Sequence, residues 1–193
     1  GELLQECAAG LLPVRVEADD DGRMIHVRAP QARMSAPVAG DAQALAEALG
    51  AMPALDPAPQ MVDNGPRWWV AGFDSAATVR GLAPDMGRLA ALTLARGAVG
   101  VAVHGPCDED GVAMAVRCFC PADGIPEDPV TGSGNAAIAA FLQAHDALPG
   151  ERWVASQGRE IGRDGRVAMA VDASGIQLGG RAVTVMDGMI RLA

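Results

Sequence analysis

Apolar and polar residues alternate in short segments along most of this chain. Leu12, Val14 and Val16 alternate with other residues, and the chain returns over residues 24–28, so the pattern predicts a β-hairpin. The tip of this hairpin is the acidic turn at residues 19–22. Its three aspartates lack the oxygen-ligand spacing of a calcium loop, and we interpret them as a solvated turn.

Further short strands are expected from the same alternation and from the glycines that bound it. They are residues 67–71, 98–104, 112–119, 153–156, 167–171, 176–178, 182–186 and 189–192. Two glycine turns, Gly179-Gly180 and Asp187-Gly188, are expected to form hairpins between the last strands. Residues 51–66 contain four prolines and are expected to form a loop.

Helices are few and are marked by capping residues. We expect them over residues 42–49 with Asp41 as cap and Gly50 as end, from Asp74 or Ser75 onward, and after Asp85 as far as Gly97. The third helix should face inward with Leu89, Leu92 and Ala95. The elements together predict an α+β fold.

The polar stretch 127–135 leads into a helix of a different kind. Pro129 disfavours helical backbone at Asp128, and Thr131 and Ser133 are common residues at helix N-termini. The N–H groups at such a start lack partners, and the positive end of the helix dipole suits an anion. Two interpretations remain open, a simple cap on a core helix and a binding site for a carboxylate.

Residues 136–142 contain no polar side chain, so this part of the helix is expected to be buried on every side. Gly132, Gly134 and Ala137 also fit a loose G-x-G-x-x-A pattern. That pattern is weak evidence for a dinucleotide, because no strand runs directly into the first glycine. A phosphate loop of the Walker type is excluded, since no lysine follows the glycines.

The composition of the chain limits the classes of partner that it can bind. Half of the residues are apolar and 3% are aromatic, so the core is built from small aliphatic side chains. The net charge of −9 argues against nucleic acid and against anionic membranes as partners. No apolar run is long enough for a transmembrane helix and no signal peptide is visible, so we expect a cytoplasmic location.

The cysteines, histidines and tryptophans do not indicate a metal site or a second substrate site. Cys118 and Cys120 share a strand face, but no third ligand completes a metal site, so buried reduced thiols are expected and no metal. The three histidines, at positions 26, 104 and 145, show no ligand spacing and are expected at the surface or partly satisfied. Trp68 and Trp69 are expected to pack in a strand rather than to line a substrate entrance.

Three segments together resemble the phenazine-biosynthesis PhzF-like isomerase family. They are Arg117-Cys118-Phe119-Cys120-Pro121 with the loop EDPVTGSGN at 127–135, Gln157-Gly158 with Gly162-Arg163, and Leu178-Gly179-Gly180-Arg181. The final alanine of the family's EDPxTGSA signature is Gly134 here. The family's S/N-E-T and G-H motifs, with a catalytic glutamate and a substrate-binding histidine, do not occur in these residues. The chain therefore looks like the C-terminal part of a family member.

The resemblance implies a diaminopimelate-epimerase-like lobe, with an antiparallel curved sheet wrapped around a central apolar helix. Residues 35–185 would form this C-terminal lobe. Residues 1–34 would be a hairpin belonging to an N-terminal lobe, and residues 186–193 a terminal strand that returns to that lobe. We expect the chain to act as a homodimer or to pair with a chain that carries the missing lobe.

The resemblance also implies a cofactor-independent acid/base isomerase of a small carboxylic acid. Asp128 would contact the substrate and assist proton transfer, and the other substrate-binding residues would be Thr131, Gly132, Ser133 and Gly134. Racemases of the related fold use a cysteine where Thr131 stands, so a two-thiol mechanism is not expected. The alternatives are a non-catalytic member that binds a small acid, and an amino-acid epimerase or hydroxyproline-type dehydratase of the same fold. Without the glutamate segment, the chain alone is expected to be inactive.

Overall fold

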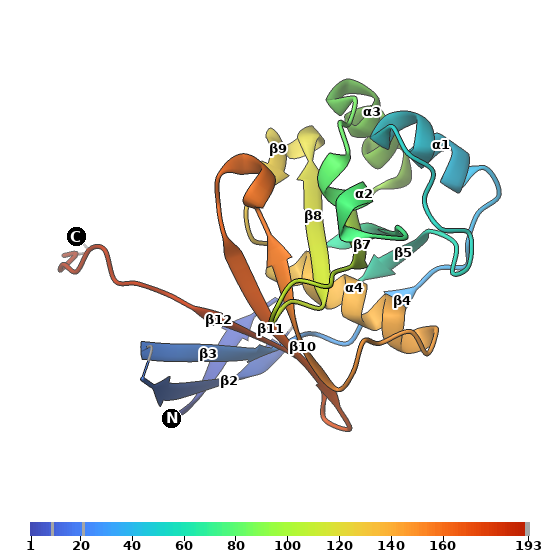
Figure 1. Ribbon diagram of the computed structural model, residues 1–193. Coiled ribbons are helices and arrows are strands. Elements are labelled where there is room, and N and C mark those ends of the chain that lie inside the picture. The colour runs from blue at the N-terminus through green and yellow to red at the C-terminus, as the bar shows by residue number, and fades with distance from the viewer. Residues whose placement is uncertain (9, 21, 192–193) are drawn as a thin grey trace.

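The computed structural model describes residues 1–8, 10–20 and 22–191, and in this part of the chain twelve strands form one sheet (Figure 1). The strands are β1 (Glu2–Cys7), β2 (Gly10–Asp19), β3 (Gly22–Arg28), β4 (Arg33–Met34), β5 (Gln60–Asp63), β6 (Arg67–Gly72), β7 (Gly100–Pro106), β8 (Met114–Cys120), β9 (Ile125–Asp128), β10 (Arg152–Gln157), β11 (Gly165–Asp172) and β12 (Gly175–Arg181). Their order in the sheet is β1-β2-β3-β12-β11-β10-β8-β7-β6-β5-β4, and β9 pairs with β8.

Four α-helices accompany the sheet in the described residues. They are α1 (Asp41–Leu49), α2 (Ala76–Gly81), α3 (Met86–Arg96) and α4 (Gly132–Ala144), with two short 3-10 turns, η1 (Pro121–Asp123) and η2 (Arg159–Ile161). None of these helices is long and apolar enough to cross a lipid bilayer.

The sheet is mixed, which corrects the expectation of an antiparallel one. β6 and β7 run parallel, and so do β8 and β10. Each parallel pair is joined by a connection that contains a helix, α2 and α3 in the first case and α4 in the second. A parallel pair requires such a crossover, whereas the short turns visible in the sequence join antiparallel neighbours.

Alternation along β6 divides the interior into two cores. Trp68 and Val70 pack in the core that contains α4, whereas Trp69 and Ala71 pack in the core beneath α1, α2 and α3. This is the period-two geometry of a strand that is buried on both faces. Both tryptophans are packing residues, as predicted, and Figure 1 shows α1, α2 and α3 gathered together.

Helix α4 is the most deeply buried of the helices. Its residues Ala137, Ala139 and Phe141 have no exposed surface, while Ala140 is partly buried. The helix contacts β5, β6 and β7 as well as β11 and β12, so strands from both ends of the sheet reach it. Its alanines allow this close approach.

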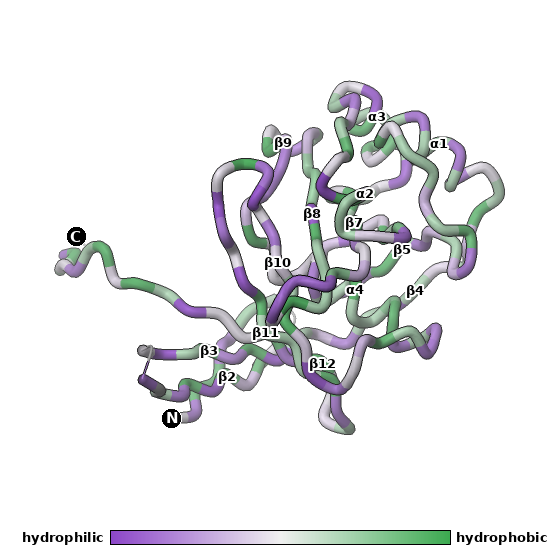
Figure 2. Tube along the Cα trace, in the orientation of Figure 1, coloured by the Kyte–Doolittle hydropathy of each residue, from purple (hydrophilic) through white to green (hydrophobic). Residues whose placement is uncertain are grey.

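The hairpin predicted near the N-terminus is confirmed as β2 and β3, which pair antiparallel. Its described side chains are exposed or half-buried, and every residue of β1, which adds to its edge, is exposed. β3 pairs with β12, so the hairpin continues the main sheet. Figure 2 shows mainly hydrophobic residues along β7 and β8, whereas hydrophobic and polar residues alternate along the hairpin.

Several local expectations were wrong. Asp41 does not cap α1, because Gly40 occupies that position and Asp41 forms an ion pair with Arg96. Residues 51–66 include the strand β5. In α3, Leu89 is buried as predicted, but Thr93 is buried too and Ala95 is exposed. Local sequence signals do not report these distant partners.

The C-terminal region also differs from expectation. Gly179 and Gly180 lie inside β12, where β3 and β11 pair on either side, and do not form a turn. Residues 182–191 form no strand, and the last residue of the second expected strand lies outside the described range. In Figure 1 this stretch runs away from the rest of the molecule, so it lacks a neighbouring strand to pair with.

Candidate functional site

A large cavity lies between the N-terminus of α4 and the sheet formed by β2, β3 and β12. Its volume is about 1210 Å³. Gly132, Ser133 and Ala136 line it from α4, and Ile25 and Leu178 are among the apolar residues that line it from the sheet. The lining also includes three arginines at positions 28, 166 and 181. A concave, mainly apolar cavity with a few convergent polar groups is the usual form of a small-molecule site.

The first turn of α4 presents backbone donors at this cavity. The Asn135 N–H is the first to close a helical hydrogen bond, to the Thr131 carbonyl oxygen at 3.0 Å. The N–H groups of Gly132, Ser133 and Gly134 precede it and lie in the part of a helix that has no intrahelical acceptors. These N–H groups and the helix dipole favour a negative charge.

Gln157 organises the loop before α4. Its Oε1 accepts hydrogen bonds from the Thr131 N–H at 3.0 Å and from Asn135 Nδ2 at 2.8 Å. Its Nε2 donates to the Asp128 carbonyl oxygen and to Thr131 Oγ1, both at 2.9 Å. Gln157 is almost fully buried, so all of its hydrogen-bonding capacity serves to hold residues 128–135 in one conformation.

Thr131 occupies the N-cap position but does not act as the expected cap. Its hydroxyl donates to Asp128 Oδ2 and does not accept a backbone N–H of the helix. The predicted capping role of Ser133 is also wrong, because Ser133 lies inside the first turn. One carboxylate oxygen of Asp128 is thereby engaged by the loop itself.

Ser133 is held from a different strand. Trp68 Nε1 donates to Ser133 Oγ at 3.1 Å, and Asn64 Nδ2 donates to the Ser133 carbonyl oxygen at 2.9 Å. Because the indole N–H can only donate, the Ser133 oxygen acts as acceptor in that contact. The Ser133 hydroxyl proton therefore remains for another acceptor.

Glu127 is not a free acid. Arg117 donates to both of its carboxylate oxygens, at 2.9 and 2.7 Å, and both side chains are nearly buried. Arg117 Nη1 also donates to the Leu82 carbonyl oxygen at 2.7 Å, just after the end of α2. This two-pronged ion pair fixes the start of the loop to the core, so Glu127 is structural.

Packing explains why position 134 is a glycine and not the alanine of the family's signature. A Cβ atom at this position would lie 2.6 Å from Cys118 Sγ, closer than real contacts allow. The thiol of Cys118 therefore fills the space that the alanine methyl group needs. Burial raises the pKa of the Cys118 thiol above its usual range and that of Cys120 to about 12. Both cysteines are free and buried, as predicted, and remain protonated at neutral pH.

The predicted site residues divide into two groups. Gly132 and Ser133 line the cavity, whereas Asp128, Thr131 and Gly134 are not among its lining residues. Asp128 is half-buried, and Thr131 and Gly134 are buried. Contact of any of the five with a substrate stays a prediction.

Gln157 and Trp68 also belong to the site, and neither was predicted from the sequence. Gln157 begins one of the quoted motifs, which was a usable signal, whereas nothing in the sequence connects Trp68 to Ser133. The expectation for His104 was wrong, since its ring is buried against Phe141 and its Nε2 has no hydrogen-bond partner. Among the described residues, no group of three His, Cys, Asp or Glu could hold a metal ion.

Comparisons with known proteins agree with one another. A family model described as phenazine biosynthesis-like protein matches residues 1–188. An uncharacterized isomerase of Deinococcus radiodurans is 33% identical over 98% of this chain and 66% of its own length. A trans-2,3-dihydro-3-hydroxyanthranilate isomerase of Pseudomonas aeruginosa is 28% identical over 65% of this chain and 45% of its own length.

Solved structures show a similar fold. The Bacillus anthracis phenazine biosynthesis protein of the PhzF family has a TM-score of 0.76 at 22% identity, over 93% of this chain and 64% of its own. A hydroxyproline epimerase of Agrobacterium vitis, with bound trans-4-hydroxy-L-proline, has a TM-score of 0.57 at 16% identity, over 94% and 56%. The chain spans 66% of the length of two curated relatives that it matches over 98% and 97% of its own length.

Proposed function

The chain belongs to the phenazine biosynthesis-like protein family, and on this premise we propose that it forms part of a cofactor-independent isomerase of a small carboxylic acid. The substrate carboxylate would bind at the N-terminus of α4. The observation that carries this proposal is that Gly132 and Ser133 bring the open first turn of α4 to a cavity of about 1210 Å³.

The directions of the hydrogen bonds in the loop favour a substrate that carries a carboxylate and a second polar group. Ser133 accepts from Trp68, so its hydroxyl would donate to the carboxylate together with the N–H groups of the first turn. Donors of this kind in a water-poor site contribute roughly 3 kcal/mol each when negative charge develops. The second oxygen of Asp128 would accept from an ammonium or hydroxyl group of the substrate, or assist proton transfer.

The catalytic glutamate would have to come from elsewhere. Neither glutamate nor histidine lines the cavity in the described part of the chain, and the Asp164 carboxylate at its rim accepts from Arg166 at 2.5 Å. We propose that residues 35–185 form one epimerase-like lobe around α4. Residues 1–34 and 186–193 would associate with a second lobe that supplies the catalytic glutamate, on this or another chain.

An amino-acid epimerase is the second candidate, because a hydroxyproline epimerase shares the fold. A mechanism with two thiols is disfavoured. Thr131 occupies the loop position where racemases of the related fold have a cysteine, and burial raises the pKa of the Cys118 thiol. The two candidates require the same carboxylate site and differ in the group that moves the proton.

The test is binding of trans-4-hydroxy-L-proline and of trans-2,3-dihydro-3-hydroxyanthranilate to the full chain, followed by NMR of the backbone amides. We expect shifts at Gly132 and Ser133, and a loss of affinity of about tenfold in Ser133→Ala. Trp68→Phe should weaken binding several-fold, because it frees the Ser133 hydroxyl to rotate.

The matched control is Ser174→Ala, in an exposed turn beyond the cavity, which should bind as the parent chain does. If Ser133→Ala and Ser174→Ala bound both acids with equal affinity, the N-terminus of α4 would not be the binding site. Incubation in deuterated water separates binding from catalysis. The chain alone should leave the substrate undeuterated, and deuterium at a carbon position would show that it carries its own base.

A further inference from the structure

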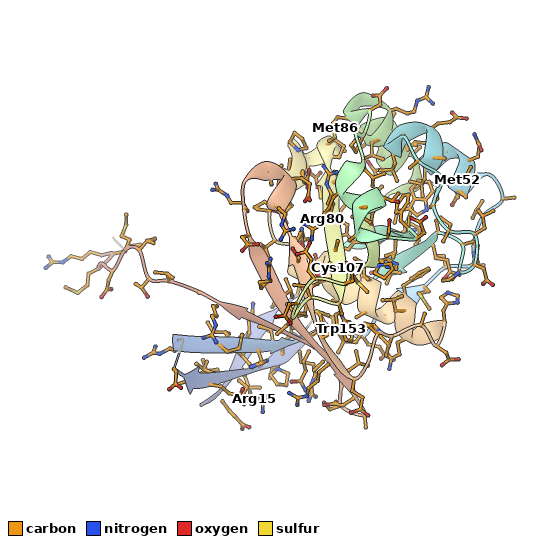
Figure 3. All side chains as sticks on the ribbon, viewed as in Figure 1. Arg15, Met52, Arg80, Met86, Cys107 and Trp153 are labelled. Carbon is orange, nitrogen blue, oxygen red and sulfur yellow. The ribbon has the colours of Figure 1, made fainter. Side chains whose placement is uncertain are left out.

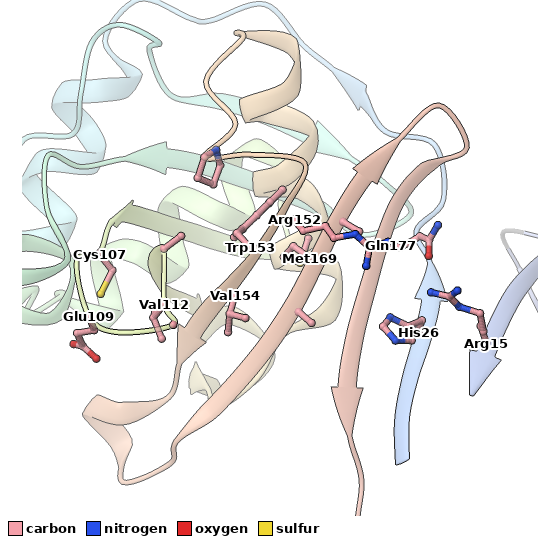
Figure 4. Close-up of a pocket in the computed structure, with 15 residues that line it drawn as sticks. Arg15, His26, Cys107, Glu109, Val112, Arg152, Trp153, Val154, Met169 and Gln177 are labelled. Carbon is pink, nitrogen blue, oxygen red and sulfur yellow. The ribbon is translucent and has the colours of Figure 1, made fainter. Parts of the chain in front are cut away.

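A second groove lies on the opposite face of the sheet from α4. It consists of two adjoining cavities of about 630 and 500 Å³ that share Arg15, His26, Arg152 and Gln177 (Figure 4). Three of the lining residues are labelled in Figure 3, Arg15 on the hairpin and Trp153 and Cys107 toward the helical half of the molecule.

Strand register explains why basic side chains collect here. Arg15 pairs with His26 across β2 and β3, and Arg28 pairs with Gln177 across β3 and β12. Gln177 pairs in turn with Ala170, which pairs with Arg152 on β10. Successive side chains of a strand point to opposite faces. These residues therefore share one face, while Val27, Leu178 and Met169 point toward α4.

Small residues leave the groove open. Gly179 and Ala168 lie between His26 and β10 on the same face. A Cβ atom at Gly179 would lie 2.9 Å from His26 Nδ1 and 3.2 Å from the Cβ of Ala168. The imidazole ring therefore rests on the glycine, and the long basic side chains at either end of the groove are not separated by bulky neighbours.

The charges of the groove are only partly balanced. Glu17 lies 3.1 Å from Arg15 and 3.2 Å from His26. Arg28 and Arg152, in contrast, form no hydrogen bond or ion pair within the described residues, and Arg28 Nε is buried without an acceptor. A buried donor without a partner usually marks a site for a water, an ion or a ligand.

Two acids that line the groove accept hydrogen bonds from other residues, although the charge of Asp172 also attracts Arg28. Asp172 accepts from the Ser174 backbone N–H at 2.7 Å and from its hydroxyl at 2.5 Å. Glu109 accepts from both terminal nitrogens of Arg159 at 2.8 Å. Within the described residues, the groove thus keeps two guanidinium groups without a hydrogen-bonded partner, on a chain whose net charge is −9.

We propose that this groove binds a small oxyanion, a phosphate or a carboxylate, between Arg28 and Arg152 with His26 and Gln177 as further partners. Guanidinium groups suit this role because their planar N–H pairs match two oxygens at once. The proposed site does not depend on the proposed isomerase function, although Arg28 lines both this groove and the cavity at α4.

The test is a calorimetric titration of the full chain with inorganic phosphate and, in a second arm, with benzoate. We expect the double variant Arg28→Gln/Arg152→Gln to lose at least tenfold in affinity for the anion that binds. Arg23→Gln/Arg33→Gln removes the same charge from exposed positions outside the groove and should lose less than twofold. The arm that shows binding identifies the oxyanion.

Two further variants keep the proposal testable. Glu17→Gln should bind the anion several-fold more tightly, because it removes the carboxylate that competes for Arg15 and His26. Arg152→Gln alone changes an exposed side chain, so folding is not at risk, and it should weaken binding about threefold or more. Equal affinities in the two double variants, or no binding of either anion by the parent chain, would overturn the proposal.

Discussion

The loop that enters α4 and the hairpin β2–β3 form opposite walls of the same cavity but are built in contrasting ways. In the loop, Gln157 alone contributes four hydrogen bonds, and Arg117 anchors Glu127 in the core. The hairpin consists of exposed or half-buried residues held mainly by backbone pairing. The difference shows that one wall is preorganised within this chain, whereas the other lacks packing on its cavity side.

The largest difference in stability between the two regions is expected when a charge is introduced into each. Ala139→Asp places a carboxylate where α4 has no exposed surface, and an unpaired buried charge costs roughly 3–5 kcal/mol or more. We expect no cooperative thermal unfolding in this variant. Leu4→Asp, on a strand residue that is 66% exposed, should change the free energy of unfolding by about 0.5 kcal/mol or less. A normal melting temperature for Ala139→Asp would show that α4 is not packed as described.

The next contrast compares two ion pairs. Arg117→Ala leaves Glu127 buried without its partner, at a cost of roughly 3–5 kcal/mol in urea unfolding. Arg15→Ala removes the exposed Arg15–Glu17 pair on the hairpin and should cost about 1 kcal/mol or less. Similar costs for the two variants would contradict the difference in burial between the walls.

Acid pH should lower the free energy of unfolding, because His104, which packs against α4, favours the neutral form in the folded state. Burial lowers the pKa of His104 from 6.5 to about 4, so the folded state favours the neutral ring. The stabilisation is complete above the unfolded pKa of 6.5 and is lost as pH falls from 6.5 to about 4, by about 3 kcal/mol in total. Unfolding free energies measured across this window should fall less in His104→Gln.

The smallest expected effect concerns two glycines. Gly134→Ala should cost roughly 1–3 kcal/mol because the new methyl group meets Cys118 Sγ, and Cys118→Ala in the same chain should recover most of it. Gly180→Ala in β12 has no atom within 4 Å of the new Cβ and should be nearly neutral. Melting temperatures of the three variants provide the measurement, and an unrescued Gly134→Ala would exclude the thiol as the cause.

The sequence alone located the features that depend on neighbouring residues. Alternation and an acidic turn predicted the β2–β3 hairpin, and Ser75, Asp85 and Gly97 marked helix ends correctly. The stretch 127–135 was identified as the approach to a helix, although only residues 129–131 form the loop, between the end of β9 and the start of α4, and its motif pointed to the family. These signals are local, because caps, turns and strand periodicity are set by residues a few positions apart.

Only the tertiary structure decided which distant residues meet. The partners of the loop come from afar, since Trp68 lies 65 positions from Ser133 and Gln157 lies 26 positions from Thr131. The parallel strand pairs, the burial of His104 and the fit of Cys118 against Gly134 depend in the same way on packing between separate elements. A local pattern carries no information about which surfaces the sheet brings together, and for that reason the site could be located from the sequence but not assembled.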